Sequence, residues 1–208
     1  MKGDARCIAN PLKKRENNMG TRNLLCVVQN GEMKVANYCQ WDGRPTHQGE
    51  GIRQFLVREY AEDKLKRFGS QIKKVKAATK AMIDKAIKTS EGMGDDFFSR
   101  RYPQFSRDTG HKILDYFMET DKPQTCLSAD FAGDSLFCEW AYVIDLDNGM
   151  LEIYKGFNRS PVPESNRFHK FTAPGEYHPV RLVKTVEISK LAGQRSLMAS
   201  IEKSGGAE

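Results

Sequence analysis

Hydrophobic residues alternate with polar ones in several short runs that predict β-strands. Asn30-Gly31 stands between the first two runs, and Asp147-Asn-Gly149 stands between the next two. An Asn-Gly pair between strand-like runs is typical of a tight hairpin, because both residues adopt positive φ readily. The chain is therefore expected to form two hairpins and one further strand, from residues 24–29, 33–39, 137–145, 150–155 and 180–188.

Between the two hairpins, apolar residues recur with helical spacing. Helices are expected from near Ile52 and over residues 110–119. The clearest stripe steps by three and four positions, which places its members on one helix face: Leu65, Phe68, Ile72, Val75, Thr79, Met82 and Ala86. We expect this segment to form a lysine-rich helix. If the segment is divided into two helices instead, we expect the break at Gly69. Strand pairs and runs of helices predict an α+β fold, with one mainly antiparallel sheet or two small ones packed against a helical layer.

The length of 208 residues suits a single domain with its own core. We expect a flexible basic extension over residues 1–18, an α+β domain over residues 19–203 and a tail over residues 204–208. No apolar run approaches the roughly 20 residues of a membrane helix, so no membrane partner is expected. The five cysteines include no CxxC pair, which favours neither a zinc site nor a disulfide framework. A cytoplasmic protein is therefore expected.

Positive charge is concentrated in one part of the chain. The formal net charge is +6, and residues 60–90 hold nine Lys and Arg against three acidic residues. Cations on a solvent-facing helix can follow a phosphate backbone. The candidate nucleic-acid contacts are Lys66, Lys73, Lys74, Lys76 and Lys80. The alternatives are an ordinary solvated helix face and a module that binds an acidic protein surface.

Both ends of the first hairpin carry polar residues that a core strand does not need. Arg22 and Asn23 open the first strand, and Gln40, Trp41 and Asp42 follow the second. These ends lie side by side in a hairpin, where they offer a guanidinium, two amides, a carboxylate and an aromatic ring. Such a group suits an anionic ligand of the nucleotide type. The alternative is a structural ion pair between Arg22 and Asp42.

Acidic residues accompany the second hairpin. Glu139 interrupts an otherwise apolar run and needs a cationic partner if it is buried, which Arg22 would supply if the two hairpins adjoin. Glu139 is therefore included in the candidate ligand site. Asp145 and Asp147 are expected to solvate strand and turn ends, with a Mg²⁺ site as the alternative. The four histidines are isolated, and no metal or other cofactor is expected.

Thr21 is the one weak candidate for a catalytic residue. Gly20-Thr21 before a hairpin is similar to the start of an N-terminal-nucleophile hydrolase such as a proteasome β-type subunit, in which cleavage after Gly frees a Thr. The position that this family fills with Asp holds Asn37, and the position that it fills with Lys holds Arg53. Asn carries no charge, and Arg does not release its proton at working pH. The sequence therefore favours a protein that is not an enzyme.

Five segments carry a resemblance to one family: Gly20-Thr-Arg-Asn-Leu24, Tyr38-Cys-Gln-Trp-Asp-Gly43, Arg107-Asp-Thr-Gly110, Ser135-Leu-Phe-Cys-Glu-Trp-Ala-Tyr-Val-Ile-Asp-Leu-Asp147 and Tyr177-His-Pro-Val-Arg-Leu-Val183. Through them, residues 19–190 resemble a family of uncharacterised proteins from phages, bacteria and some fungi. Cys39 and Arg44 depart from the Gly and Tyr that the family usually has there. The resemblance implies a phage-encoded host-interaction or counter-defence factor that acts in the host cytoplasm.

These observations predict a non-enzymatic binding protein for an anionic partner. The partner is expected to be a nucleotide-type small molecule at the hairpin ends or nucleic acid on the lysine-rich helix. The alternatives are a hydrolase that uses Thr21 and a protein-interaction module that uses the lysine-rich helix.

Overall fold

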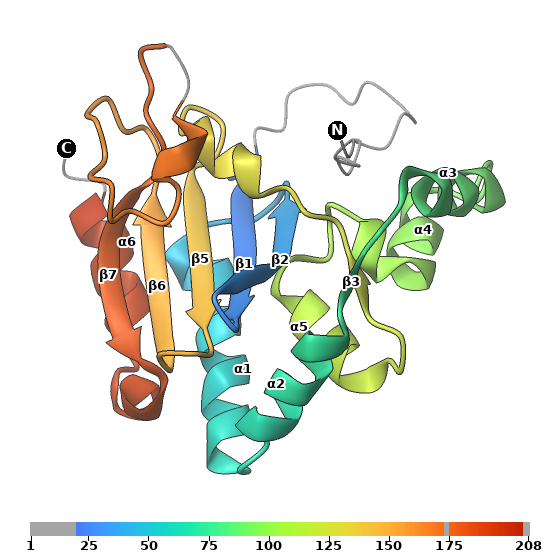
Figure 1. The fold of residues 1–208 in the computed structure, drawn as a ribbon, viewed down its shortest axis with the longest axis horizontal. Coiled ribbons are helices and arrows are strands. Elements are labelled where there is room, and N and C mark those ends of the chain that lie inside the picture. The colour runs from blue at the N-terminus through green and yellow to red at the C-terminus, as the bar shows by residue number, and fades with distance from the viewer. Residues whose placement is uncertain (1–19, 173–174, 206–208) are drawn as a thin grey trace.

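The computed structural model describes residues 20–172 and 175–205 (Figure 1). The extension predicted at residues 1–18 lies outside these residues. The elements in chain order are β1 (Asn23–Gln29), β2 (Glu32–Cys39), α1 (Glu50–Ala61), α2 (Leu65–Lys74), β3 (Lys76–Ala77), α3 (Lys80–Thr89), α4 (Asp95–Arg101), α5 (Ile113–Glu119), β4 (Gln124–Thr125), β5 (Trp140–Asp145), β6 (Met150–Lys155), β7 (Arg181–Glu187) and α6 (Leu197–Gly205).

A five-stranded sheet organises the fold, with the strand order β2-β1-β5-β6-β7. The predicted hairpins are confirmed as β1–β2 and β5–β6, and Asn30 and Gly31 have the positive φ values of 55° and 69° that a tight turn requires. The hairpins join through β1 and β5, which pair in parallel, whereas the other neighbours in this sheet are antiparallel. The fold is therefore α+β, as the sequence predicts.

Both faces of the sheet are covered, which explains why β1 and β5 are buried along their whole length. Alternate strand residues such as Leu25, Tyr142 and Ile153 pack against α1, α2, α5 and α6 on one face. The other alternate residues, such as Cys26 and Val143, pack against short helical turns at residues 129–133 and 169–171. We call these the helix face and the loop face of the sheet (Figure 1).

The single lysine-rich helix predicted over residues 65–86 is wrong, because the structure divides this segment into α2, β3 and α3. The chain leaves the helix at Val75, and Lys76 then pairs in parallel with Gln124 of β4. Thr79 starts α3 as its N-cap, and its hydroxyl accepts a hydrogen bond from the backbone N–H of Met82 at 3.3 Å. Gly69 is not the break; it lies inside α2.

The predicted apolar stripe accordingly serves two separate cores. Phe68 and Ile72 of α2 are fully buried against the helix face of the sheet. Ile83 and Ala86 of α3 belong to a small cluster with Phe105 instead. Figure 1 shows α3 and α4 together at one side of the molecule, away from the five-stranded sheet. The lysines of this segment are therefore carried by two helices and the strand between them.

Charged residues organise the end of the sheet that holds the two hairpin turns. Asp145 is only 2% exposed, and its Oδ1 accepts hydrogen bonds of 3.0 Å from the backbone N–H groups of Asp147 and Asn148. The carboxylate of Asp147 in turn accepts hydrogen bonds of 2.7 and 2.8 Å from the first hairpin turn, at Asn30 and Gly31. Asp145 and Asp147 were expected to solvate the strand and turn ends, and the structure shows that their carboxylates accept specific hydrogen bonds there. Asp147 thereby links the turn of the second hairpin to the turn of the first.

Arg167 completes this hydrogen-bond network on the loop face. Its guanidinium donates a hydrogen bond of 2.8 Å to Asp145 Oδ2 and also bonds Glu152. The hydroxyl of Tyr154 donates to Glu152 at 2.6 Å. Burial and the bond to Glu152 raise the pKa of Tyr154, so this phenol stays protonated as a donor. A partly buried cation therefore bridges two carboxylates over the sheet.

We predict that Asp145→Asn destabilises the fold by about 1–3 kcal/mol at pH 7, because it removes the acceptor charge from a buried network. Burial opposes the charged form of Asp145, but hydrogen bonds from Asn148 and Arg167 outweigh it, so the pKa of this carboxyl lies below its ordinary value. The stabilisation is therefore complete above the unfolded pKa of about 3.9 and disappears as the pH falls through the folded pKa.

Urea unfolding of the wild type and Asp145→Asn between pH 3 and pH 7 checks this prediction. Asp121→Asn is the control, because Asp121 is exposed and has no side-chain partner among the described residues. A stability gap that stays constant down to pH 3 would contradict the account.

Candidate functional site

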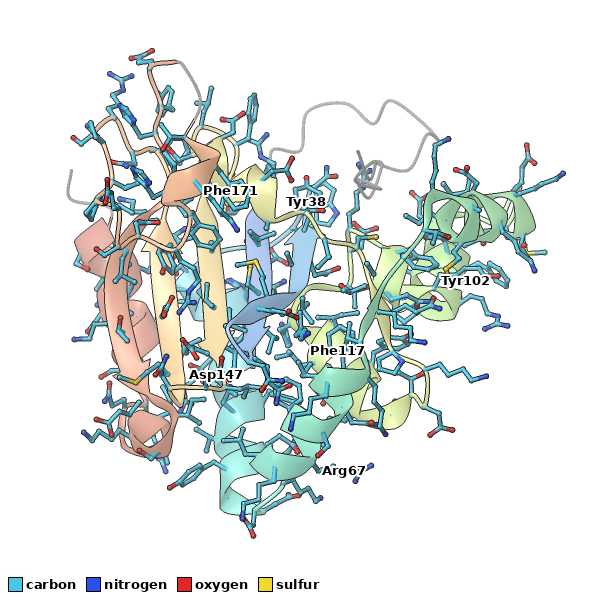
Figure 2. All side chains as sticks on the ribbon, in the orientation of Figure 1. Tyr38, Arg67, Tyr102, Phe117, Asp147 and Phe171 are labelled. Carbon is cyan, nitrogen blue, oxygen red and sulfur yellow. The ribbon has the colours of Figure 1, made fainter. Side chains whose placement is uncertain are left out.

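The candidate ligand-binding residues lie together at the end of the sheet opposite Asp147. The strand register aligns Cys39, Asn23, Trp140, Lys155 and Arg181 in one row across all five strands. The five segments that carry the family resemblance all reach this row or lie next to it, and we call it the motif end of the sheet. Figure 2 shows Tyr38 and Phe171 at this end, with Asp147 at the opposite end.

Arg22 and Glu139 meet at the motif end, as predicted for adjoining hairpins. The backbone N–H of Arg22 donates a hydrogen bond of 3.1 Å to Glu139 Oε1, and the Arg22 Nε lies 3.7 Å from the same oxygen. The guanidinium carbon of Arg22 stands 4.7 Å from the centre of the Phe137 ring. The alternative ion pair between Arg22 and Asp42 does not form; Asp42 is exposed, and its carboxylate has no partner among the described residues.

The remaining polar groups of the first hairpin bind neighbouring segments. The indole N–H of Trp41 donates a hydrogen bond of 2.6 Å to Asp108 Oδ1. The backbone N–H of Gln40 donates to the carbonyl of Arg107 at 2.9 Å. The amide of Asn23 donates to the carbonyls of Cys39 and Trp41, both at 3.4 Å. Most of the predicted ligand-binding groups therefore have partners within the protein.

Sequence reasoning did not predict the contacts by which Arg107 and Asp108 hold Gln40 and Trp41 in place. Both residues belong to the Arg107-Asp-Thr-Gly110 segment of the family resemblance, which was the only sequence signal that pointed to this part of the site. Their contact with the first hairpin joins positions about 67 residues apart, and the pattern of the intervening helices gives no indication of it.

The side chain of Gln48 holds the segment at His111 next to this site. Its Oε1 accepts a hydrogen bond of 2.7 Å from the backbone N–H of His111 and lies 3.1 Å from the ring Nδ1. Burial lowers the pKa of His111, which favours its neutral form. Burial also raises the pKa of Cys39, so this thiol is poorly suited to act as a nucleophile. These groups support the site structurally.

Two arginines flank Tyr38 on the loop face. The Tyr38 ring packs edge to face on Phe131 with 4.9 Å between ring centres. Burial raises the pKa of Tyr38, and the positive charges of Arg22 and Arg107 act in the opposite direction. The Nε atoms of both arginines are buried without a hydrogen-bond partner in the described part of the chain. Two guanidinium groups with an unsatisfied Nε each therefore lie near the aromatic pair of Tyr38 and Phe131.

The surroundings of Thr21 give no support to a catalytic role. Its carbonyl accepts a hydrogen bond of 2.8 Å from the backbone of Gly43, and its hydroxyl has no partner in residues 20–172 and 175–205. Arg53 is held by Glu50 at 2.7 Å, and this bond raises the pKa of Arg53. Arg53 therefore stays protonated. Asn37 is buried within β2 and cannot supply a charge.

All five candidate nucleic-acid contacts are exposed on α2, β3 and α3. Lys74 donates a hydrogen bond of 2.8 Å to Gln71, and Lys80 lies 3.5 Å from Asp84. The other three ammonium groups form no hydrogen bond or ion pair with a described residue: Lys66, Lys73 and Lys76. We call the five lysines Lys66, Lys73, Lys74, Lys76 and Lys80 the lysine surface.

Comparison with known proteins finds no matching family model, curated protein or solved structure. The family resemblance of the five segments therefore stays a prediction. No three His, Cys, Asp or Glu side chains in the described ranges are placed to hold a metal ion. The helices within these ranges are too short or too polar to span a membrane.

We predict that Glu139→Ala destabilises the protein more than Glu139→Gln. Alanine removes the acceptor of the Arg22 backbone N–H, at a cost of about 1–2 kcal/mol, whereas glutamine keeps an oxygen there and loses only a partly exposed ion pair worth under about 1 kcal/mol. Equilibrium unfolding in urea measures both values. Equal losses for the two substitutions would show that the charge, rather than the backbone bond, is what matters.

Proposed function

We propose that the protein is a non-enzymatic binding protein for an anionic partner, and that this partner is nucleic acid contacted by the lysine surface. The observation that carries the proposal is the lack of neutralising partners for Lys66, Lys73 and Lys76 among the described residues. Exposed ammonium groups release condensed counterions when they meet a phosphate backbone, and this release supplies the affinity of nonspecific binding.

The lysine surface favours a long partner over a small one. Its cations extend from α2 through β3 to the start of α3. Among the described residues, Asp84 is the acid that pairs with a member of this surface, Lys80, and the exposed pair contributes little. A linear polyanion can contact lysines spread in this way, whereas a small anion reaches only one or two of them.

The first hairpin is a weaker place for the partner. Arg22 is engaged by Glu139, and Trp41 is engaged by Asp108. Asp42, which has no side-chain partner among the described residues, carries a negative charge that repels an anion. Binding there would have to compete with bonds that the protein already makes.

The family resemblance extends this proposal to a biological role. A phage-encoded protein that binds nucleic acid in the host cytoplasm could act as a host-interaction or counter-defence factor. An acidic protein surface is the alternative partner for the same lysines, since it would also exploit their charge.

We predict that Lys73→Glu combined with Lys76→Glu weakens nucleic-acid binding and reduces its salt dependence. Removal of two phosphate contacts lowers the magnitude of the slope of log K against log salt by roughly 1.8 for duplex DNA and roughly 1.4 for a single strand. Fluorescence anisotropy with labelled oligonucleotides between 50 and 200 mM salt measures this slope.

The matched control is Lys184→Glu combined with Lys203→Glu, because both lysines are exposed, lie on β7 and α6, and give the same change in net charge. The control is expected to keep most of the wild-type slope. Equal losses for the two double variants, or no binding by the wild type at 50 mM salt, would overturn the proposal. Retention on an acidic protein with no binding of oligonucleotides would favour the alternative.

A further inference from the structure

The solvent face of α2 carries positive charge and no negative charge. The helix contains four Lys or Arg residues and no acidic residue. A solvated helix face ordinarily mixes both signs, because opposite charges three or four positions apart stabilise the helix. Such pairs cannot form within α2, so helix stability does not explain its charge. The exposed side chains of α2 are four cations and one serine: Lys66, Arg67, Ser70, Lys73 and Lys74.

The start of α2 adds a second unfavourable feature. Lys66 and Arg67 lie in the first turn, no acidic residue accompanies them there, and the side chain of the N-cap residue Lys64 forms no capping bond. The N-terminus of a helix carries a partial positive charge, so cations in its first turn are destabilising. A contact with an anionic partner would offset this local cost.

Packing holds α2 in place with this face turned to solvent. Phe68 and Ile72 are fully buried against the sheet. The Gln71 amide and the Arg67 guanidinium both donate hydrogen bonds to the carbonyl of Met118, at 3.5 and 3.3 Å. Figure 2 shows Arg67 at the outer edge of the helical layer. The cations therefore project from a fixed helix that is anchored to the core.

The cations form two groups along the helix axis. Lys66 and Arg67 lie near its start, and Lys73 and Lys74 lie at its end. From Lys66 to Lys73 the helix makes nearly two turns and advances about 10.5 Å, so both groups lie on the same side. Two rows of phosphates border the minor groove of B-form DNA, which is about 6 Å wide, and long lysine side chains can reach both rows. A single strand offers one row only.

Base stacking has no support on this face. Phe68, the aromatic residue of α2, is buried. In the described part of the chain, the exposed aromatic residues are Tyr60, Phe137 and Phe157, and all three lie outside α2, β3 and α3. Proteins that bind single strands stack successive bases on aromatic side chains. The face therefore suits a phosphate backbone whose bases stay paired.

The polar groups of α2 also give no means of reading a base sequence. Gln71, the amide side chain of this helix, is 8% exposed and bound to backbone carbonyls. The Ser70 hydroxyl donates a hydrogen bond of 3.0 Å to the Lys66 carbonyl. Contacts from lysine to phosphate position a protein on a duplex but carry no sequence information. Binding through this face is therefore expected to be independent of sequence.

We propose that the anionic partner is duplex DNA, and that α2 lies across its minor groove with one cationic group on the phosphates of each strand. The proposal rests on the nucleic-acid binding inferred above, and it adds the class of nucleic acid and the helix that contacts it. Arg67 and Ser70, which were not candidates from the sequence, belong to the contact face.

Fluorescence anisotropy of the full chain with a labelled DNA duplex, its separate strands and an RNA duplex of the same sequence tests this proposal. The DNA duplex is expected to bind about tenfold or more tightly than either strand at 50 mM salt, because it carries about twice the charge per unit length. The RNA duplex is expected to bind more weakly than the DNA duplex, because its minor groove is wide and shallow. AT-rich and GC-rich DNA duplexes are expected to bind within about twofold of each other.

Lys66→Gln combined with Lys73→Gln is expected to lower the magnitude of the salt slope for duplex DNA by roughly 1.8. Neither ammonium group has a partner among the described residues, so no protein bond is lost. The matched control is Lys85→Gln combined with Lys88→Gln, because both lysines are exposed on α3 and the change in net charge is the same. The control is expected to keep most of the slope.

Ser70→Glu separates a binding loss from a folding loss. A carboxylate at this position lies between the two cationic groups and repels phosphate, so duplex binding is expected to fall by about tenfold at 50 mM salt. The same carboxylate can pair with Lys74, four positions later, so the free variant is expected to be at least as stable as the wild type in thermal unfolding. Tyr60→Ala is expected to leave duplex binding unchanged.

Separate strands or an RNA duplex that bind as tightly as the DNA duplex would overturn the proposed contact with duplex DNA. If Lys73→Glu combined with Lys76→Glu still weakened that binding, the proposed function would stand. Equal slopes for the α2 variant and its α3 control, unchanged binding by Ser70→Glu, or a loss in Tyr60→Ala would overturn the role of α2. No binding of any nucleic acid by the folded wild type would overturn both proposals.

Discussion

The parallel pairing of β1 with β5 is the contact on which the rest of the structure depends. It joins two hairpins that are each local in sequence, and it gives β1 and β5 a neighbouring strand on both edges. Parallel strands require a crossover connection, and here residues 30–139, which include β2, supply it. That connection forms most of the helical layer, which α6 completes, and it carries the lysine surface. The same pairing places Arg22 next to Glu139 and aligns the segments of the motif end.

Charged groups at both ends of the sheet bind neighbouring groups of the protein. At the turn end, Asp145, Asp147 and Arg167 bind one another or backbone groups, and their role is structural. At the motif end, the charged and polar groups of the first hairpin also bind their neighbours, as Arg22 does with Glu139 and Trp41 does with Asp108.

The features that sequence predicts here are the local ones. The Asn30-Gly31 turn is fixed by the φ preferences of two adjacent residues, so the hairpin could be predicted. The break before α3 depends on Lys76 pairing with Gln124, which is distant in sequence. The alignment of β7 with β6 along the edge of the sheet is likewise a long-range pairing, and no spacing in the sequence reveals its register. The contact between Arg22 and Glu139 could be predicted only from their opposite charges.

Nuclear Overhauser contacts between β1 and β5 in the labelled protein test the central pairing most directly. The parallel register predicts backbone contacts between Cys26 and Val143 and between Leu24 and Ala141. It also predicts slow exchange of the Glu139 amide, which donates to the carbonyl of Arg22. Contacts in an antiparallel register, or a β1 that meets only β2, would contradict the account, since the motif end would then not exist.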